Sequence, residues 1–214
     1  KRQKYFWRKI KLFLLFKAFE RKICKMNYKS TRNSQVIYTS EQVLNYGLAP
    51  DGGLFIPELL PIFSQDEIKS LKGSSYYDIA NFIMKPFLTD LFSEEEIKII
   101  IREAYSNFDN ELVSLTPMGN NYLLNLFHGP TLAFKDYAMS LLAKIYEHYL
   151  EKKKKKLVII GATSGDTGSA AIHAFKGIKN IKFFILHPHN STSLFQRKQM
   201  TTSGADNVFN IAIN

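Results

Sequence analysis

The segment LFHGPTLAFKD, at residues 126–136, places Lys135 at the end of an apolar run that follows a Gly-Pro turn. Apolar neighbours desolvate a lysine and lower its pKa, which prepares the amine to form a Schiff base with an aldehyde. Asp136 follows at the expected start of a long helix. Because most lysines are solvated surface residues, this context by itself is only suggestive of a covalent role.

A second segment, GATSGDTG at residues 161–168, consists mainly of small residues between an apolar strand and a helix. It lacks the Gly-Lys-Ser/Thr ending of a P-loop, and Thr163 replaces the middle glycine of a dinucleotide-binding fingerprint. Backbone N–H groups at the start of a helix bind carboxylates and phosphates. We therefore predict a carboxylate-binding loop formed by Thr163, Ser164, Gly165 and Thr167. With Lys135, it indicates an enzyme that uses pyridoxal phosphate on an amino-acid substrate.

Strands and helices alternate around these two motifs. We expect strands at 112–115, 122–127, 157–160, 182–186 and 207–213, and helices at 135–151, 167–177 and 193–202. Such alternation indicates an α/β domain, which we assign to residues 113–214. The strand at 157–160 is wholly apolar, which is typical of a parallel sheet covered on both faces.

Residues 26–112 carry signals for helices instead. Capping-box spacing predicts three helix starts, from the pairs Thr39 with Gln42, Ser64 with Glu67, and Ser93 with Glu96. The corresponding helices are expected near 40–47, 65–72 and 94–107, with another at 77–89. We therefore expect residues 26–112 to form a mostly helical N-terminal domain.

The net charge of +10 is concentrated at the start of the chain. Residues 1–25 hold ten Lys/Arg against one Glu, a net charge of +9, which leaves +1 for the remainder. A near-neutral body gives no indication of nucleic-acid binding. The basic segment also carries aromatic residues, so it is either a membrane-surface helix or an extension outside the enzyme body. Any membrane contact is expected through this segment alone.

The single cysteine, Cys24, excludes an intrachain disulfide and a cysteine-cluster metal site. The spacing of the histidines matches no metal motif, so no metal is expected. We interpret His128 as a residue that orients its loop through hydrogen bonds rather than as an acid or base. The body of the chain fits a cytoplasmic protein.

The two motifs, in this order, resemble those of the threonine synthase family, within the pyridoxal-phosphate-dependent enzymes of fold type II. The resemblance extends to MNYKSTR at 26–32 and to GLAPDGGLFIP at 47–57. It implies an α/β fold in which a helical N-terminal domain precedes a parallel-sheet pyridoxal-phosphate domain. It also implies the conversion of O-phospho-L-homoserine and water to L-threonine and phosphate.

The resemblance implies roles for individual residues. Lys135 would hold the cofactor and move protons. Asp166, where fold-type II relatives commonly carry Asn, would either contact the cofactor near its phenolic oxygen or shape the loop. Phe134 would either pack near the cofactor ring or belong to the core. Arg32 would pair with the substrate phosphate.

In this family a second glycine-rich loop binds the cofactor phosphate and another group contacts the pyridine nitrogen, both downstream of the region described here. We therefore expect the chain to be the N-terminal part of a longer enzyme and to be inactive alone. Two other interpretations remain open. One is a phospholyase on the same scaffold, which would release a keto acid. The other is a non-catalytic fragment that associates with membranes through residues 1–25.

Overall fold

A computed structural model describes residues 25–109, 111–189 and 191–214. The predicted basic extension therefore lies outside the described residues, apart from its last residue. The contacts group the described residues into two compact units. The first unit comprises residues 25–70 with Ile83–Ser93, and the second comprises Leu71–Phe82 with Glu94–Asn214. The predicted domain boundary near residue 112 stays a prediction.

The first unit contains a small antiparallel sheet. Its central strand β1 (Asn27–Ser30) pairs with β2 (Ile37–Thr39) on one side and with β3 (Phe55–Pro57) on the other. The expectation of a mostly helical N-terminal domain missed this sheet. The strands are only three or four residues long, which is too short to show the alternation of apolar and polar residues that identifies a strand.

The helices of this region begin where capping-box spacing predicts. At the start of α2 (Ser40–Tyr46), the Gln42 amide donates to Thr39 Oγ1 at 3.3 Å and the Thr39 amide donates to the Gln42 side chain at 2.9 Å. Ser64 and Glu67 form the same reciprocal pair before α3 (Gln65–Ser70). The predicted helix at 77–89 is α4 (Tyr76–Leu88). Local sequence therefore determines these helix starts.

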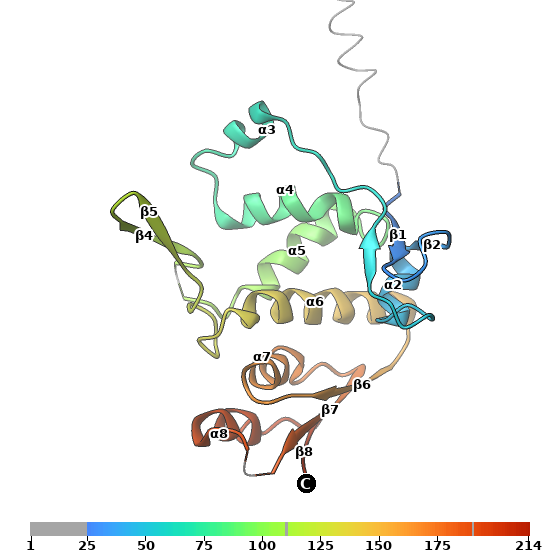
Figure 1. Cartoon of the computed structure of the whole chain (residues 1–214), viewed down its shortest axis with the longest axis vertical. Helices are drawn as coiled ribbons and strands as arrows, with labels where there is room; N and C mark the ends of the chain where they lie inside the picture. The colour runs from blue at the N-terminus through green and yellow to red at the C-terminus, as the bar shows by residue number, and fades with distance from the viewer. Residues whose placement is uncertain (1–24, 110, 190) are drawn as a thin grey trace, which may run out of the picture. The chain divides into compact units, whose positions relative to one another are not determined.

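The second unit is of the α/β class, as predicted (Figure 1). Three strands form its parallel sheet in the order β6-β7-β8, and helices connect them. None of the described helices has the length and apolar character needed to cross a membrane. The elements are α5 (Glu94–Ala104), β4 (Ser114–Met118), β5 (Asn121–Asn125), α6 (Lys135–Lys153), β6 (Leu157–Ala162), α7 (Asp166–Phe175), β7 (Ile181–Pro188), α8 (Leu194–Thr201) and β8 (Val208–Ile213).

The parallel sheet buries one face only. Phe183 and Ile185 point to the covered face and are almost completely buried. On the opposite face, Val158 is 58% exposed and Ile160 is 71% exposed. The prediction of a sheet covered on both faces is therefore wrong for the described residues. β6 nevertheless has the apolar composition of a strand that is buried on both faces of a sheet. An apolar face exposed to water favours association with another chain or segment.

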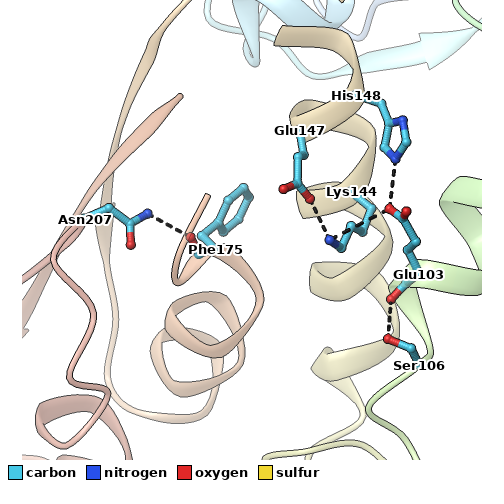
Figure 2. Close-up of polar contacts among 7 residues, drawn as sticks. All are labelled: Glu103, Ser106, Lys144, Glu147, His148, Phe175 and Asn207. Carbon is cyan, nitrogen blue, oxygen red and sulfur yellow. Dashed lines mark hydrogen bonds and ion pairs between the residues drawn. The ribbon is translucent and has the colours of Figure 1, made fainter. Parts of the chain in front are cut away.

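Charged side chains bridge α5 and α6 in the second unit (Figure 2). The Glu103 carboxylate lies 2.9 Å from His148 Nε2 and 3.9 Å from Lys144 Nζ. Lys144 also pairs with Glu147 at 2.6 Å, within α6. Partly exposed pairs of this kind contribute at most about 1 kcal/mol each. The contact between these helices therefore depends mainly on buried apolar residues, among them Ile97, Ile100, Ile101, Ala143 and Tyr149.

Asn207 ties the end of α7 to the sheet, and Figure 2 shows its bond to Phe175. Its Nδ2 group donates to the carbonyls of Phe175, Ile178 and Ile181 at 2.9, 3.3 and 3.1 Å. Its Oδ1 accepts from the Gly177 amide at 2.8 Å. One side chain thus forms hydrogen bonds with four backbone groups where α7 passes into β7.

We expect Asn207→Ala to lower the free energy of unfolding by about 1–3 kcal/mol, because the Gly177 amide loses its acceptor and three carbonyls lose a donor. Urea titration followed by circular dichroism measures the change. As a control, Asn207→Asp keeps the acceptor for Gly177 but brings a carboxylate against three carbonyl oxygens, so it should be at least as destabilising. A loss below about 1 kcal/mol in both variants would contradict this role.

Candidate functional site

Asp136 holds the turn that precedes Lys135. It is 1% exposed, and its carboxylate accepts hydrogen bonds from the Thr131 amide at 2.8 Å and the Thr131 hydroxyl at 2.6 Å. A Cβ atom on Gly129 would lie 2.5 Å from the Asp136 side chain, so only glycine fits there. Leu132 adopts a left-handed conformation, with φ of 61°, which is unfavourable for a residue with a side chain. The bonds to Asp136 hold this strained turn and fix the start of α6.

The Lys135 amine is available to a ligand. Lys135 is the first residue of α6 and is half-buried. Its Nζ lies 4.3 Å from the centre of the Phe134 ring, a cation–π contact. Among the described residues, none forms a hydrogen bond or ion pair with this ammonium group. Phe134 is 62% exposed, so it does not belong to the core of this unit.

The small-residue loop joins β6 to α7, at the carboxyl end of a parallel strand where α/β sheets commonly bind ligands. Thr163 Oγ1 accepts hydrogen bonds from the amides of Gly165 at 3.1 Å and Gly168 at 2.9 Å. Because these bonds occupy both acceptor positions of the hydroxyl, its own proton is left to donate. A Cβ atom on Gly168 would lie 2.3 Å from Thr163, so glycine is required for this closure.

The start of α7 presents free backbone donors. Its N-cap is Gly165, which provides no side-chain hydrogen bond. The amides of Ser164, Asp166 and Thr167 find no acceptor within the described part of the chain. Unpaired N–H groups at a helix N-terminus attract anions, and the helix dipole adds to that attraction. The loop therefore has the geometry of a carboxylate site, and the individual contacts predicted for its residues stay predictions.

Asp166 contacts a helix that the sequence analysis did not connect with the site. It is exposed, and its Oδ1 accepts a hydrogen bond from Gln196 Nε2 of α8 at 2.5 Å. Asp166 thus has a contact that shapes the loop. The contact with the cofactor stays a prediction.

An apolar cleft of about 240 Å³ lies beside the loop. It is formed by α6, α7 and the covered face of the sheet, and Thr163 and Thr167 contribute to its lining. Lys135 is not among the lining residues, so this cleft is not the predicted lysine site. Its walls are mainly apolar, and the titratable side chain among the lining residues is Tyr146.

Arg32 lies in the first unit, on a turn that is fixed by hydrogen bonds. Its amide donates to Ser30 Oγ at 3.1 Å, and its Nη1 donates to the Asp51 carbonyl at 3.2 Å. The Ser30 hydroxyl donates to Asp51 Oδ1 at 2.7 Å, and this bond lowers the pKa of the Asp51 carboxyl. Arg32 is exposed and retains donors for an anion. Since Lys135 belongs to the second unit, a shared site stays a prediction.

The histidines provide no metal site in the described ranges. His128 Nε2 lies 3.0 Å from Ser114 Oγ, and His128 Nδ1 lies 3.9 Å from Asp109. These contacts agree with the interpretation that His128 orients its loop. No group of three or more His, Cys, Asp or Glu among the residues described here has a geometry suited to a metal ion.

Comparison with known proteins gives the family. Residues 27–105 match the family model of the threonine synthase N terminus. The curated threonine synthase of Pseudomonas aeruginosa is 47% identical over 190 residues, which are 88% of this chain and 40% of that enzyme. The chain belongs to the threonine synthase family. It corresponds to the N-terminal part and spans about 40% of the length of this relative.

Solved structures agree with this threonine synthase assignment. The structure of threonine synthase from Brucella melitensis, which contains bound pyridoxal phosphate, matches with a TM-score of 0.83 and 41% identity. The match covers 88% of this chain and 41% of the Brucella chain. The yeast threonine synthase structure matches with a TM-score of 0.81 and 35% identity, covering 87% of this chain and 40% of the yeast chain.

Sequence reasoning missed three residues that support the candidate site of this threonine synthase relative. Asp136 was placed at a helix start, but its bonds to Thr131 were not foreseen. Gln196 and Gln199 of α8 were not considered. The helix itself is predicted at 193–202, and Ser193 and Gln196 form a capping box at its start. No local pattern gives the contacts of the two glutamines, because their partners lie 30 and 68 residues away.

Proposed function

We propose that this chain provides the cofactor lysine and the substrate-carboxylate loop of an enzyme that converts O-phospho-L-homoserine and water to L-threonine and phosphate. The reaction uses pyridoxal 5′-phosphate, with phosphate elimination as its carbon–oxygen lyase step. The observation that carries the proposal is the presence of the unpaired Lys135 amine and the free backbone amides at the start of α7 in one compact unit.

The residues present fit the cofactor. Lys135 has an amine without a partner among the described residues, and the exposed Phe134 ring beside it offers an apolar surface. When bound, pyridoxal phosphate supplies an electron sink for the substrate carbons that lose protons. Lys135 holds the cofactor and, once released, its Nζ moves a proton at the substrate Cα.

The other residues bind and orient the substrate. The Thr163 hydroxyl and the free amides of Ser164 and Thr167 hold its carboxylate at the start of α7. Gly165 contributes the backbone of the loop, since its own amide is bonded to Thr163 Oγ1. Arg32 pairs with the leaving phosphate, because its planar guanidinium suits phosphate oxygens. Asp166 contacts the cofactor while Gln196 holds its carboxylate.

The proposal includes a division of the chain and a location. Residues 26–112 form the N-terminal domain, and residues 113–214 form the first part of the catalytic domain. The phosphate anchor of the cofactor and the partner of its pyridine nitrogen come from the part of the family's length that this chain does not span. The enzyme works in the cytoplasm on a small-molecule substrate, and residues 1–25 are not required.

The test is a chimera in which this chain replaces the matching part of the Pseudomonas aeruginosa threonine synthase. With O-phospho-L-homoserine, we expect the chimera to release threonine and phosphate in equal amounts, and the 214-residue chain alone to release neither. Chromatography of the amino-acid products and a phosphate assay measure both. A soluble, cofactor-loaded chimera that forms a keto acid instead would contradict the proposal and identify a phospholyase.

A further inference from the structure

Helix α8 packs closely against the start of α7. Met200 is completely buried, and a Cβ atom on Gly168 would lie 2.9 Å from the Met200 sulfur. The helix begins in a well-defined place, because Ser193 Oγ accepts a hydrogen bond from the Gln196 amide at 3.2 Å. These contacts fix α8 relative to α7, and with it the α8 side chains that face the candidate site.

Gln196 lies directly against the carboxylate loop. Its Oε1 accepts from the Ser193 hydroxyl at 3.0 Å, and its Nε2 donates to Asp166 Oδ1 at 2.5 Å. The opposite orientation of the amide would place oxygen against the carboxylate, so these two partners determine which way it points. A Cβ atom on Gly165 would lie 2.4 Å from the Gln196 side chain. Gln196 thus supports both the backbone of the loop and the carboxylate of Asp166.

Gln199 reaches the other part of the candidate site. It lies one helical turn after Gln196, on the same side of α8. Its Nε2 donates to the Thr131 carbonyl at 3.3 Å. Thr131 is the residue that Asp136 holds through its amide and hydroxyl, and Lys135 lies beside Asp136. One side of α8 therefore contacts both the strained lysine turn and the carboxylate loop.

We propose that Gln196 and Gln199 are positioning residues that hold the carboxylate loop, at 161–168, and the lysine turn, at 129–136, in a fixed relation. The inference rests on the proposed function, since the relation matters for catalysis only if both segments act on one substrate. Small displacements of a reacting group lower rates steeply. Two glutamines on a rigid helix prevent such displacements without contacting the substrate.

The first experiment uses the 214-residue chain without cofactor and measures hydrogen–deuterium exchange. Gln196→Glu keeps the capping box, in which glutamate is a usual partner, but places a carboxylate against Asp166. We expect exchange at 163–168 to rise about fivefold, as the loss of one hydrogen bond predicts. Ser193→Ala is the matched control, because it removes the cap and keeps the bond to Asp166. In Ser193→Ala, faster exchange should be confined to the first turn of α8.

Gln199→Met tests the second contact in the same way. Methionine has a similar length and suits a helix, but it cannot donate to the Thr131 carbonyl. We expect faster exchange at 129–136 and unchanged exchange at 163–168. Exchange like that of the unaltered chain in both Gln196→Glu and Gln199→Met would overturn the inference.

The second experiment uses the chimera and steady-state kinetics with O-phospho-L-homoserine. We expect Gln196→Glu to lower kcat/KM by about 10- to 100-fold, and Ser193→Ala to stay within about twofold. In the Asp166→Asn background, the Gln196→Glu substitution should cost less, because an asparagine amide donates to the new carboxylate. If Gln196→Glu lowers kcat/KM by the same factor in both backgrounds, the lost contact with Asp166 is not the cause of the loss. A chimera without any threonine synthesis contradicts the proposed function, whereas the exchange results still decide the positioning role.

Discussion

Replacing Lys135 by alanine in the chimera is expected to abolish covalent attachment of pyridoxal phosphate completely. The amine is the only group in the lysine motif that can bond to the cofactor aldehyde, and its contact with the Phe134 ring leaves its nitrogen available. Borohydride reduction followed by peptide mapping measures the attachment. The unaltered chimera should carry the label on the peptide that contains residue 135, together with a visible absorbance band.

Two further variants separate loss of the amine from loss of structure. Lys135→Arg keeps a positive charge beside Phe134 but offers no amine of suitable reactivity, so it should also remain unlabelled. Lys155→Ala alters an exposed lysine beyond the end of α6 and should be labelled normally. Retention of the label in Lys135→Ala would show that another lysine holds the cofactor, and the site would then have to be assigned again.

The 214-residue chain alone is expected to associate through the uncovered face of its parallel sheet. Ile160 of β6 is 71% exposed there, and Ile211 of β8 is 42% exposed, so both outer strands of the sheet present apolar side chains to water. Contiguous apolar patches on soluble proteins mark surfaces that another chain or segment covers. We expect strong binding of a hydrophobic dye and concentration-dependent association, both measurable by fluorescence and sedimentation.

Charged residues placed on this face should reverse the association. We expect Ile160→Lys combined with Ile211→Lys to reduce dye fluorescence several-fold and to give a monomer, because neither side chain is part of the buried core. Ile99→Lys makes the same chemical change at an exposed position of α5 and should have little effect. If the double variant associates as strongly as the unaltered chain, the sheet face is not the cause.

Much of the secondary structure could be predicted because its signals are local. The reciprocal bonds of Thr39 with Gln42 and of Ser64 with Glu67 depend on residues three positions apart. The alternation of strands and helices after residue 112 likewise follows from short runs of apolar residues. β1, β2 and β3 escaped prediction because each is stabilised by pairing with strands distant in the sequence rather than by its own pattern.

The candidate site likewise has parts that local sequence predicts and parts that depend on contacts between distant segments. The lysine motif, the small-residue loop before α7 and the family to which both point could be predicted from the residues alone, since these are continuous segments with a specific residue order. The packing of the folded chain was needed to show that α8 lies against both segments, that Gln199 contacts Thr131 across 68 residues, and that Asn207 closes the end of α7. Such bonds form only when the packed elements bring donor and acceptor within about 3 Å of each other. Residue propensities and hydrophobic periodicity describe local structure and do not predict these long-range distances.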